Sequence, residues 1–131
     1  MRKLREFVQA ADWKTEKHVL AIEYPEAVNG GEKFEVKVSV GKEIAHPNTT
    51  EHHIRWIQVF FQPAGEQYSY ELVNCEFTAH GESVQGANQG PVYSEPVGST
   101  TAMVNKPGTI YALSLCNIHG LWESSKEVSI G

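Results

Sequence analysis

The chain alternates polar and apolar residues in the stretch Lys33-Phe34-Glu35-Val36-Lys37-Val38-Ser39-Val40. Successive residues of a β-strand point to opposite faces of the sheet, so this pattern puts the apolar side chains on one face and the polar ones on the other. One face then covers a hydrophobic core while the other meets water. This alternation therefore predicts that residues 33–40 form a half-buried strand of the kind found in antiparallel sheets.

Residues 54–62 carry apolar side chains on both faces, among them Trp56, Ile57 and Phe60, which predicts a central strand. Other short segments with strand-forming residues lie between turn signals. They are residues 19–23, 68–78, 92–94, 100–105, 109–116 and 126–130.

Little of the sequence favours a helix. Leu4, Phe7 and Val8 recur at helical spacing, so residues 2–11 predict a short N-terminal helical segment. The Asn-Lys-Pro-Gly run at 105–108 has the chemistry of a hairpin turn. Many short strands separated by turns, with almost no helix, predict an all-β fold, an antiparallel β-sandwich.

The composition limits the kind of protein. A length of 131 residues fits one domain, residues 1–131, with enough chain for a hydrophobic core. The hydrophobic share of 40% and the charged share of 21% are ordinary for a globular protein. Sixteen acidic and 11 basic residues give a net charge of -5, which argues against nucleic acid or an anionic membrane as the main partner.

The two cysteines, Cys75 and Cys116, are too few for a disulfide framework. Residues 1–11 contain no continuous apolar region of the kind that a signal peptide needs. No apolar run is long enough to span a bilayer. We therefore expect a cytoplasmic protein with reduced thiols.

A cysteine and a histidine three residues apart occur in the run Cys116-Asn117-Ile118-His119-Gly120-Leu121-Trp122, directly after a predicted strand. Across a turn, a thiolate and an imidazole can reach one metal ion, and this pair suits zinc, copper or iron. A buried cysteine at a strand end, followed by a histidine in a turn, has the same sequence. The motif alone leaves both interpretations open.

Five more histidines are spread through the chain. His46 and His52 lie in a polar loop whose Pro-Asn turn could bring their rings together, although a solvated loop has the same composition. His53 begins the next strand and is expected to point away from His52. His18 and His80 are isolated, and a lone histidine is more often a surface or structural residue than a ligand.

The loops of a β-sandwich gather at its two ends, which changes the interpretation of these residues. One mononuclear site could draw its ligands from such segments: His18, His46, His52, Cys116 and His119. Four equatorial nitrogens and one axial sulfur leave the sixth position of an octahedral ion open. Iron suits this arrangement, whereas zinc prefers four ligands.

Three segments resemble the signatures of the superoxide reductase, or desulfoferrodoxin, family. They are Glu-Lys-His-Val at 16–19, His-Pro-Asn-Thr-Thr-Glu-His-His-Ile-Arg-Trp at 46–56 and the run at 116–122. The similarity includes residues 77–86, covers nearly the whole chain and is greatest to the single-iron, neelaredoxin-like branch. The two-iron branch has an additional four-cysteine site, which two cysteines cannot form, so one iron is expected.

The resemblance implies an immunoglobulin-like β-sandwich and a role for each residue of the site. The four histidines that resemble the equatorial iron ligands are His18, His46, His52 and His119. Cys116 resembles the axial thiolate. Glu16 resembles the carboxylate that can occupy the sixth position when the iron is ferric, and Lys17 resembles the cation beside that position.

The implied activity is the one-electron reduction of superoxide to hydrogen peroxide, with a donor such as rubredoxin restoring the ferrous state. Cys116 would push electron density onto the iron, and Lys17 would attract the anionic substrate to an acidic protein. The family also implies a homotetramer. One departure is Leu20, which replaces the proline that usually follows Glu-Lys-His-Val, so the loop with Glu16 and Lys17 is expected to be more mobile.

Two other classes of protein share parts of this pattern. A copper electron-transfer protein is also a β-sandwich with a Cys-to-His loop, but that loop continues to a methionine, and no methionine follows Cys116. A non-catalytic immunoglobulin-like binding module would carry the histidines incidentally. The metal content of the purified protein separates the three classes.

Overall fold

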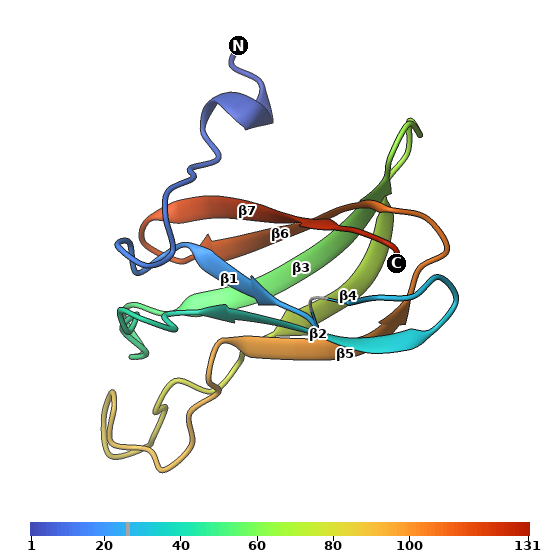
Figure 1. Ribbon diagram of the computed structural model, residues 1–131. Helices are drawn as coiled ribbons and strands as arrows, with labels where there is room; N and C mark the ends of the chain where they lie inside the picture. The colour runs from blue at the N-terminus through green and yellow to red at the C-terminus, as the bar shows by residue number, and fades with distance from the viewer. Residues whose placement is uncertain (26) are drawn as a thin grey trace.

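Two antiparallel sheets form the computed structural model, which describes residues 1–25 and 27–131 (Figure 1). The smaller sheet has the order β1-β2-β5, with β1 at Leu20–Glu23, β2 at Lys33–Val40 and β5 at Val97–Met103. The larger sheet has the order β4-β3-β6-β7, with β4 at Tyr70–Glu76, β3 at Ile54–Pro63, β6 at Gly108–Cys116 and β7 at Gly120–Val128. The prediction of an all-β, immunoglobulin-like sandwich is confirmed.

The core lies between the two sheets, where the predicted apolar faces meet. Val36 and Val38 of β2 are each 1% exposed, and Lys37 between them is exposed, as the alternation predicted. Ser39 was expected on the outer face, but it is buried at 6% exposure. Strand β3 is central, because it pairs with β4 along one edge and with β6 along the other. Ile57 in the middle of β3 is 0% exposed. Each such side chain contributes about 1.5–3 kcal/mol by leaving water.

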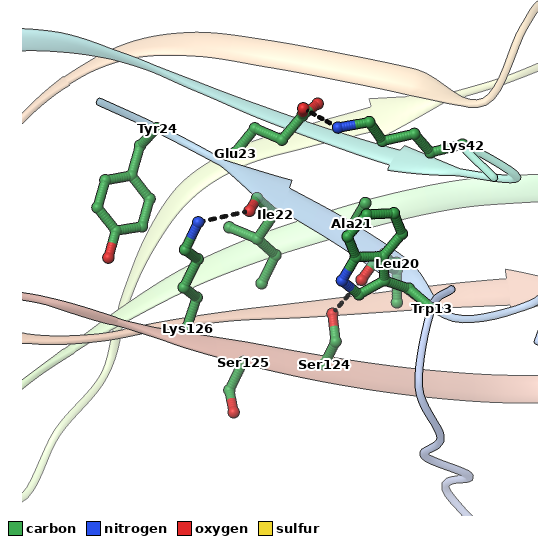
Figure 2. Close-up of a pocket in the computed structure, with 10 residues that line it drawn as sticks. All are labelled: Trp13, Leu20, Ala21, Ile22, Glu23, Tyr24, Lys42, Ser124, Ser125 and Lys126. Atoms are coloured by element: carbon green, nitrogen blue, oxygen red, sulfur yellow. Dashed lines mark hydrogen bonds and ion pairs between the residues drawn. The ribbon is translucent and has the colours of Figure 1, made fainter. Parts of the chain in front are cut away.

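The edge strands β1 and β7 close one side of the sandwich (Figure 2). Strand β1 pairs with β2 along one edge, and side chains of β7 satisfy carbonyl groups on its other edge. The Ser124 hydroxyl donates to Leu20 O at 2.8 Å, and the Lys126 ammonium donates to Ile22 O at 3.4 Å. These bonds hold the start of β1 against β7. His18 lies shortly before β1, so its backbone is held in place as well.

The predicted N-terminal helical segment is shorter than residues 2–11. A single 3-10 turn spans Leu4–Glu6, and Leu4 and Phe7 are 55% and 44% exposed. A short helix needs a packed apolar face to be stable. The chain instead extends, and Gln9 forms a parallel bridge with Trp122 of β7. Within residues 1–25 and 27–131, no helix has the length and apolar character that crossing a membrane requires.

Three predictions between β4 and β6 were wrong in detail. Residues 92–94 form no strand, because only an isolated bridge joins Tyr93 to His80. Strand β5 spans Val97–Met103 instead of 100–105. Residues 105–108 connect β5 in one sheet to β6 in the other, and therefore do not turn a hairpin within one sheet.

The last strand was also placed wrongly. Strand β7 spans Gly120–Val128, whereas the sequence predicted residues 126–130. Its middle reads Glu-Ser-Ser-Lys-Glu at 123–127, which is an edge segment with most side chains in water. Such a strand has no clear apolar alternation, because pairing with β6 and not burial holds it in place.

Candidate metal centre

Three segments meet at one end of the sandwich, on the left in Figure 1. His18 precedes β1, His46 and His52 lie in the loop between β2 and β3, and Cys116 and His119 lie at the turn between β6 and β7. Four of these residues have a donor atom within 4.8 Å of each of the other three: His18, His52, Cys116 and His119. The loops of the sandwich thus bring together segments that are far apart in the chain.

The ring nitrogens have the separations that neighbouring ligands of one ion require. His119 Nδ1 lies 3.1 Å from His18 Nε2 and 3.2 Å from His52 Nε2. Cys116 Sγ lies 3.8 Å from His119 Nδ1. Two nitrogens that are each about 2.1 Å from a metal ion, at a right angle to one another, lie about 3 Å apart. The donor set therefore fits a single ion.

His46 stands beside these four residues with one nitrogen unused. Its Nδ1–H donates to Pro47 O at 2.7 Å, which leaves the lone pair on Nε2. That Nε2 is buried and has no hydrogen-bond partner in the described part of the chain. The ring centre lies 4.8 Å from that of His18 and 4.7 Å from that of His52. A buried nitrogen without a partner calls for an explanation, and a metal ion would supply it.

Burial also keeps His46 neutral, as a metal ligand must be. Desolvation lowers the pKa of His46 to about 4, although the hydrogen bond to Pro47 O opposes the shift. The pKa of His18 and the pKa of His52 are lowered as well, in both cases mainly by burial. At neutral pH these imidazoles therefore offer lone pairs.

His18 is held on two sides. Its Nδ1–H donates to Glu16 Oε1 at 2.8 Å, and its backbone N–H donates to the same oxygen at 3.0 Å. Its ring stacks on Trp122, with centres 4.7 Å apart and planes 9° from parallel. These contacts direct His18 Nε2 toward the other donors. They also lower the pKa of Glu16, mainly through the side-chain hydrogen bond from His18.

Lys17 follows Glu16 and is half-buried near the cluster. Its positive charge is one of the smaller causes, after burial, that lower the pKa of His18, His46 and His52. A cation that acts on three of the imidazoles lies near enough to attract an anion to them.

The β6–β7 turn places the sulfur in the interior and its histidine at the surface. Cys116, at the end of β6, is 1% exposed, whereas His119 is exposed. The His119 N–H donates to Cys116 Sγ at 3.3 Å, which stabilises a thiolate. Gly120 closes the turn with φ at +81°, a conformation that glycine adopts without steric cost.

The two remaining histidines form a separate structural pair. His53 and His80 are buried and their rings stack, with centres 3.5 Å apart and planes 7° from parallel. His80 Nε2–H donates to Phe77 O at 2.9 Å, and His53 Nδ1–H donates to Thr49 O at 2.8 Å. His53 packs against His80, as expected for a residue that points away from His52.

Two amides near the cluster were missed from the sequence. Gln9 Nε2 donates to His119 O at 2.9 Å. Asn88 Oδ1 accepts from the Thr50 N–H at 2.8 Å. The signal for Asn88 is weak: its φ of +65° is a conformation that asparagine tolerates better than most residues. For Gln9 the sequence offers no signal.

The fold and the cluster define a β-sandwich protein with a histidine–cysteine site suited to one metal ion. The chain belongs to the desulfoferrodoxin family, whose sequence pattern matches residues 10–125.

Proteins with sequences similar to this chain are named neelaredoxin or superoxide reductase. Neelaredoxin of Megalodesulfovibrio gigas is 56% identical over 128 residues, which cover 98% of each chain. Superoxide reductase of Pyrococcus furiosus is 54% identical over 121 residues, which cover 92% of this chain and 95% of that one. Among solved structures, the superoxide reductase (neelaredoxin) of Archaeoglobus fulgidus in the reduced form is 52% identical and aligns with a TM-score of 0.87, covering 95% of this chain and 99% of the other.

Proposed function

We propose that this protein is a superoxide reductase, which reduces superoxide by one electron to hydrogen peroxide at one mononuclear non-haem iron. One observation carries the proposal: the donors of His18, His52, Cys116 and His119 lie within 4.8 Å of one another. The His46 ring lies beside those of His18 and His52, and its buried Nε2 has no partner among the described residues. The relatives named superoxide reductase support the choice of substrate.

For each proposed ligand, one donor atom would bind the metal ion. The five are His18 Nε2, His46 Nε2, His52 Nε2, His119 Nδ1 and Cys116 Sγ. Four nitrogens and one thiolate suit iron better than zinc, which closes its shell at four ligands. When bound, iron would supply the electron: superoxide, one electron and two protons give hydrogen peroxide.

The acidic chain needs a local cation to receive an anion. At a net charge of -5, the protein as a whole repels superoxide. We assign the local attraction to Lys17, whose influence on three imidazoles supports a position at the site.

Glu16 has two proposed roles. It orients His18 by accepting the Nδ1–H, and this contact supports the first role. In the oxidised protein, Glu16 would instead bind the iron, as the family resemblance implies. Both hydrogen bonds from His18 go to Oε1, so the second role would fall to Oε2 or would require these bonds to break.

Cys116 would tune the iron if the ion binds here. A thiolate ligand pushes electron density onto iron. The His119 N–H that Cys116 Sγ accepts withdraws part of that density and thereby moderates the push.

Partners and assembly belong to the same proposal. A rubredoxin-like donor would deliver the electron at the exposed edge of His119. We further propose a cytoplasmic homotetramer in which residues 1–131 act as one domain. Exposed apolar residues on the outer faces, such as Tyr70 and Met103, which are 54% and 56% exposed, support subunit contacts.

Metal analysis with optical spectroscopy tests the proposal. We expect one iron per chain and a visible sulfur-to-iron charge-transfer band in the oxidised protein. Cys116→Ser should abolish the band, whereas Cys75→Ser, on β4, should keep it. Copper in place of iron, a protein without metal, or a band that survives Cys116→Ser would contradict the proposal.

A further inference from the structure

Asn117 links the two loops that carry most of the proposed ligands. It lies between Cys116 and His119 in the β6–β7 turn and is half-buried. Its Nδ2 donates to Glu51 O at 2.9 Å, and its Oδ1 accepts from the His53 N–H at 2.8 Å. Its own backbone N–H donates to His53 O at 3.2 Å. One residue of the turn thus makes three bonds to the β2–β3 loop.

These bonds bracket His52. Glu51 precedes it and His53 follows it, so the peptide groups on both sides of His52 are tied to the turn. The position of the His52 ring relative to Cys116 and His119 therefore depends on Asn117. Loss of the Asn117 side chain would remove the bonds to Glu51 O and the His53 N–H, and would leave the backbone bond to His53 O in place.

The chemistry of the link requires an amide of this length. An amide offers a donor and an acceptor at once, and Asn117 uses both. A carboxylate would set an acceptor against the Glu51 carbonyl, and a hydroxyl is too short to span both groups. Neither could reproduce the pair of bonds.

The other neighbours hold each loop separately. Asn88 bonds the Thr50 N–H and so braces the β2–β3 loop alone. Gln9 bonds His119 O and so braces the turn alone. Asn117 makes side-chain bonds from one ligand-bearing segment to the other, and for this reason the coupling is assigned to it.

We propose that Asn117 is a positioning residue that couples the two ligand-bearing loops, and thereby sets the metal affinity and the geometry of the metal–sulfur bond. This inference rests on the proposed metal centre. Residues that orient metal ligands typically change metal affinity by about 10- to 100-fold when they are replaced. Loss of the Asn117 side chain should fall in this range.

Titration of the metal-free protein with Co²⁺ tests the coupling, followed through the sulfur-to-metal absorption band. The wild type should bind one ion, and Asn117→Ala should bind about 10- to 100-fold more weakly. At saturating Co²⁺, the band of Asn117→Ala should also shift, because His52 relaxes relative to Cys116. Asn74→Ala, an exposed position on β4, should match the wild type in both respects.

A residue needed only for folding would lower the melting temperature but leave the saturated spectrum unchanged, and that result would overturn the inference. Asn117→Ser, which keeps a turn-forming residue, serves if Asn117→Ala does not fold, with the same expectations. If the wild type and the Asn117 variants bind Co²⁺ equally tightly, the coupling by Asn117 is refuted and the metal centre is not. A wild type that binds no ion refutes the metal centre, and the coupling with it.

Discussion

The tautomers of two histidines are set by groups outside the cluster. The Nδ1–H of His18 donates to Glu16, and the Nδ1–H of His46 donates to the Pro47 carbonyl. Each ring is thereby left with its lone pair on Nε2. Histidines that ligate metals are commonly oriented in this way, through the nitrogen that does not face the ion. The proposed metal ion would account for the buried Nε2 of His46, which has no hydrogen-bond partner among residues 1–25 and 27–131.

Replacement of Lys17 by alanine should slow the reaction with superoxide. Removing one positive charge beside the site weakens the attraction of the anion, so the second-order rate constant should fall by about tenfold at low ionic strength. The difference should shrink as salt is added, because screening shortens the range of the interaction. Pulse radiolysis at several ionic strengths measures both effects.

Lys106→Ala is the matched control for Lys17→Ala. It removes the same charge, but far from the metal centre. Lys106 pairs with Glu66 near Pro63 of β3 and its partner Gly108 of β6. His53 and Cys116 lie at the opposite ends of these two strands. Its rate should stay close to that of the wild type. Equal losses in the two variants would show that net charge matters and that Lys17 has no special position.

The candidate ligands could be found from the sequence, but their supports could not. Cys116 and His119 stand out by spacing, and the resemblance to the family added the others. In the sequence, Asn117 stands out only as part of the Cys-to-His motif, because its bonds to Glu51 and His53 join residues that are far apart in the chain. Such bonds depend on how two loops pack, and no local pattern encodes them.

Among the elements, burial decided which could be predicted. Strands β2 and β3 bury apolar side chains at regular positions and were found close to their observed bounds. Strand β7 is a largely polar edge strand, and its start was missed. The apolar residues at 2–11 suggested a helix, but the backbone of Gln9 pairs with β7 instead. Edge pairing leaves little trace in a sequence, because it needs no particular side chains.

The contact between strands β1 and β7, called the seam below, should depend on Ser124 for its stability. Replacement by alanine removes the hydrogen bond to Leu20 O and leaves that buried carbonyl without its side-chain donor. The free energy of unfolding should fall by about 1–2 kcal/mol, as measured by denaturant titration.

Ser125→Ala is the comparison for Ser124→Ala at the neighbouring residue. Ser125 is exposed, so its loss should change the free energy of unfolding by no more than about 0.5 kcal/mol. If both variants lose the same stability, the hydroxyl of Ser124 does not hold the seam.

For the whole molecule, the buried histidines make the stability of the metal-free protein depend on pH. The pKa of His46 is about 4 in the folded chain against a reference of 6.5. Between these values the unfolded chain binds more protons, so the free energy of unfolding should decrease as pH falls from about 6.5 to about 4. His46 alone accounts for at most about 3 kcal/mol of this decrease.

Urea unfolding of the metal-free protein at a series of pH values measures this dependence. His46→Asn cannot titrate and should show a shallower slope over the same range, whatever its stability at neutral pH. A slope equal to that of the wild type would mean that His46 is not buried in its neutral form.

We propose that this site reduces superoxide and does not merely bind metal. The most direct measurement is the yield of hydrogen peroxide and dioxygen when the fully reduced protein reacts with less than one equivalent of superoxide. Reduction predicts one hydrogen peroxide for every superoxide consumed and no dioxygen. Half that yield of hydrogen peroxide, accompanied by dioxygen, would reveal dismutation and contradict the proposed superoxide reductase activity.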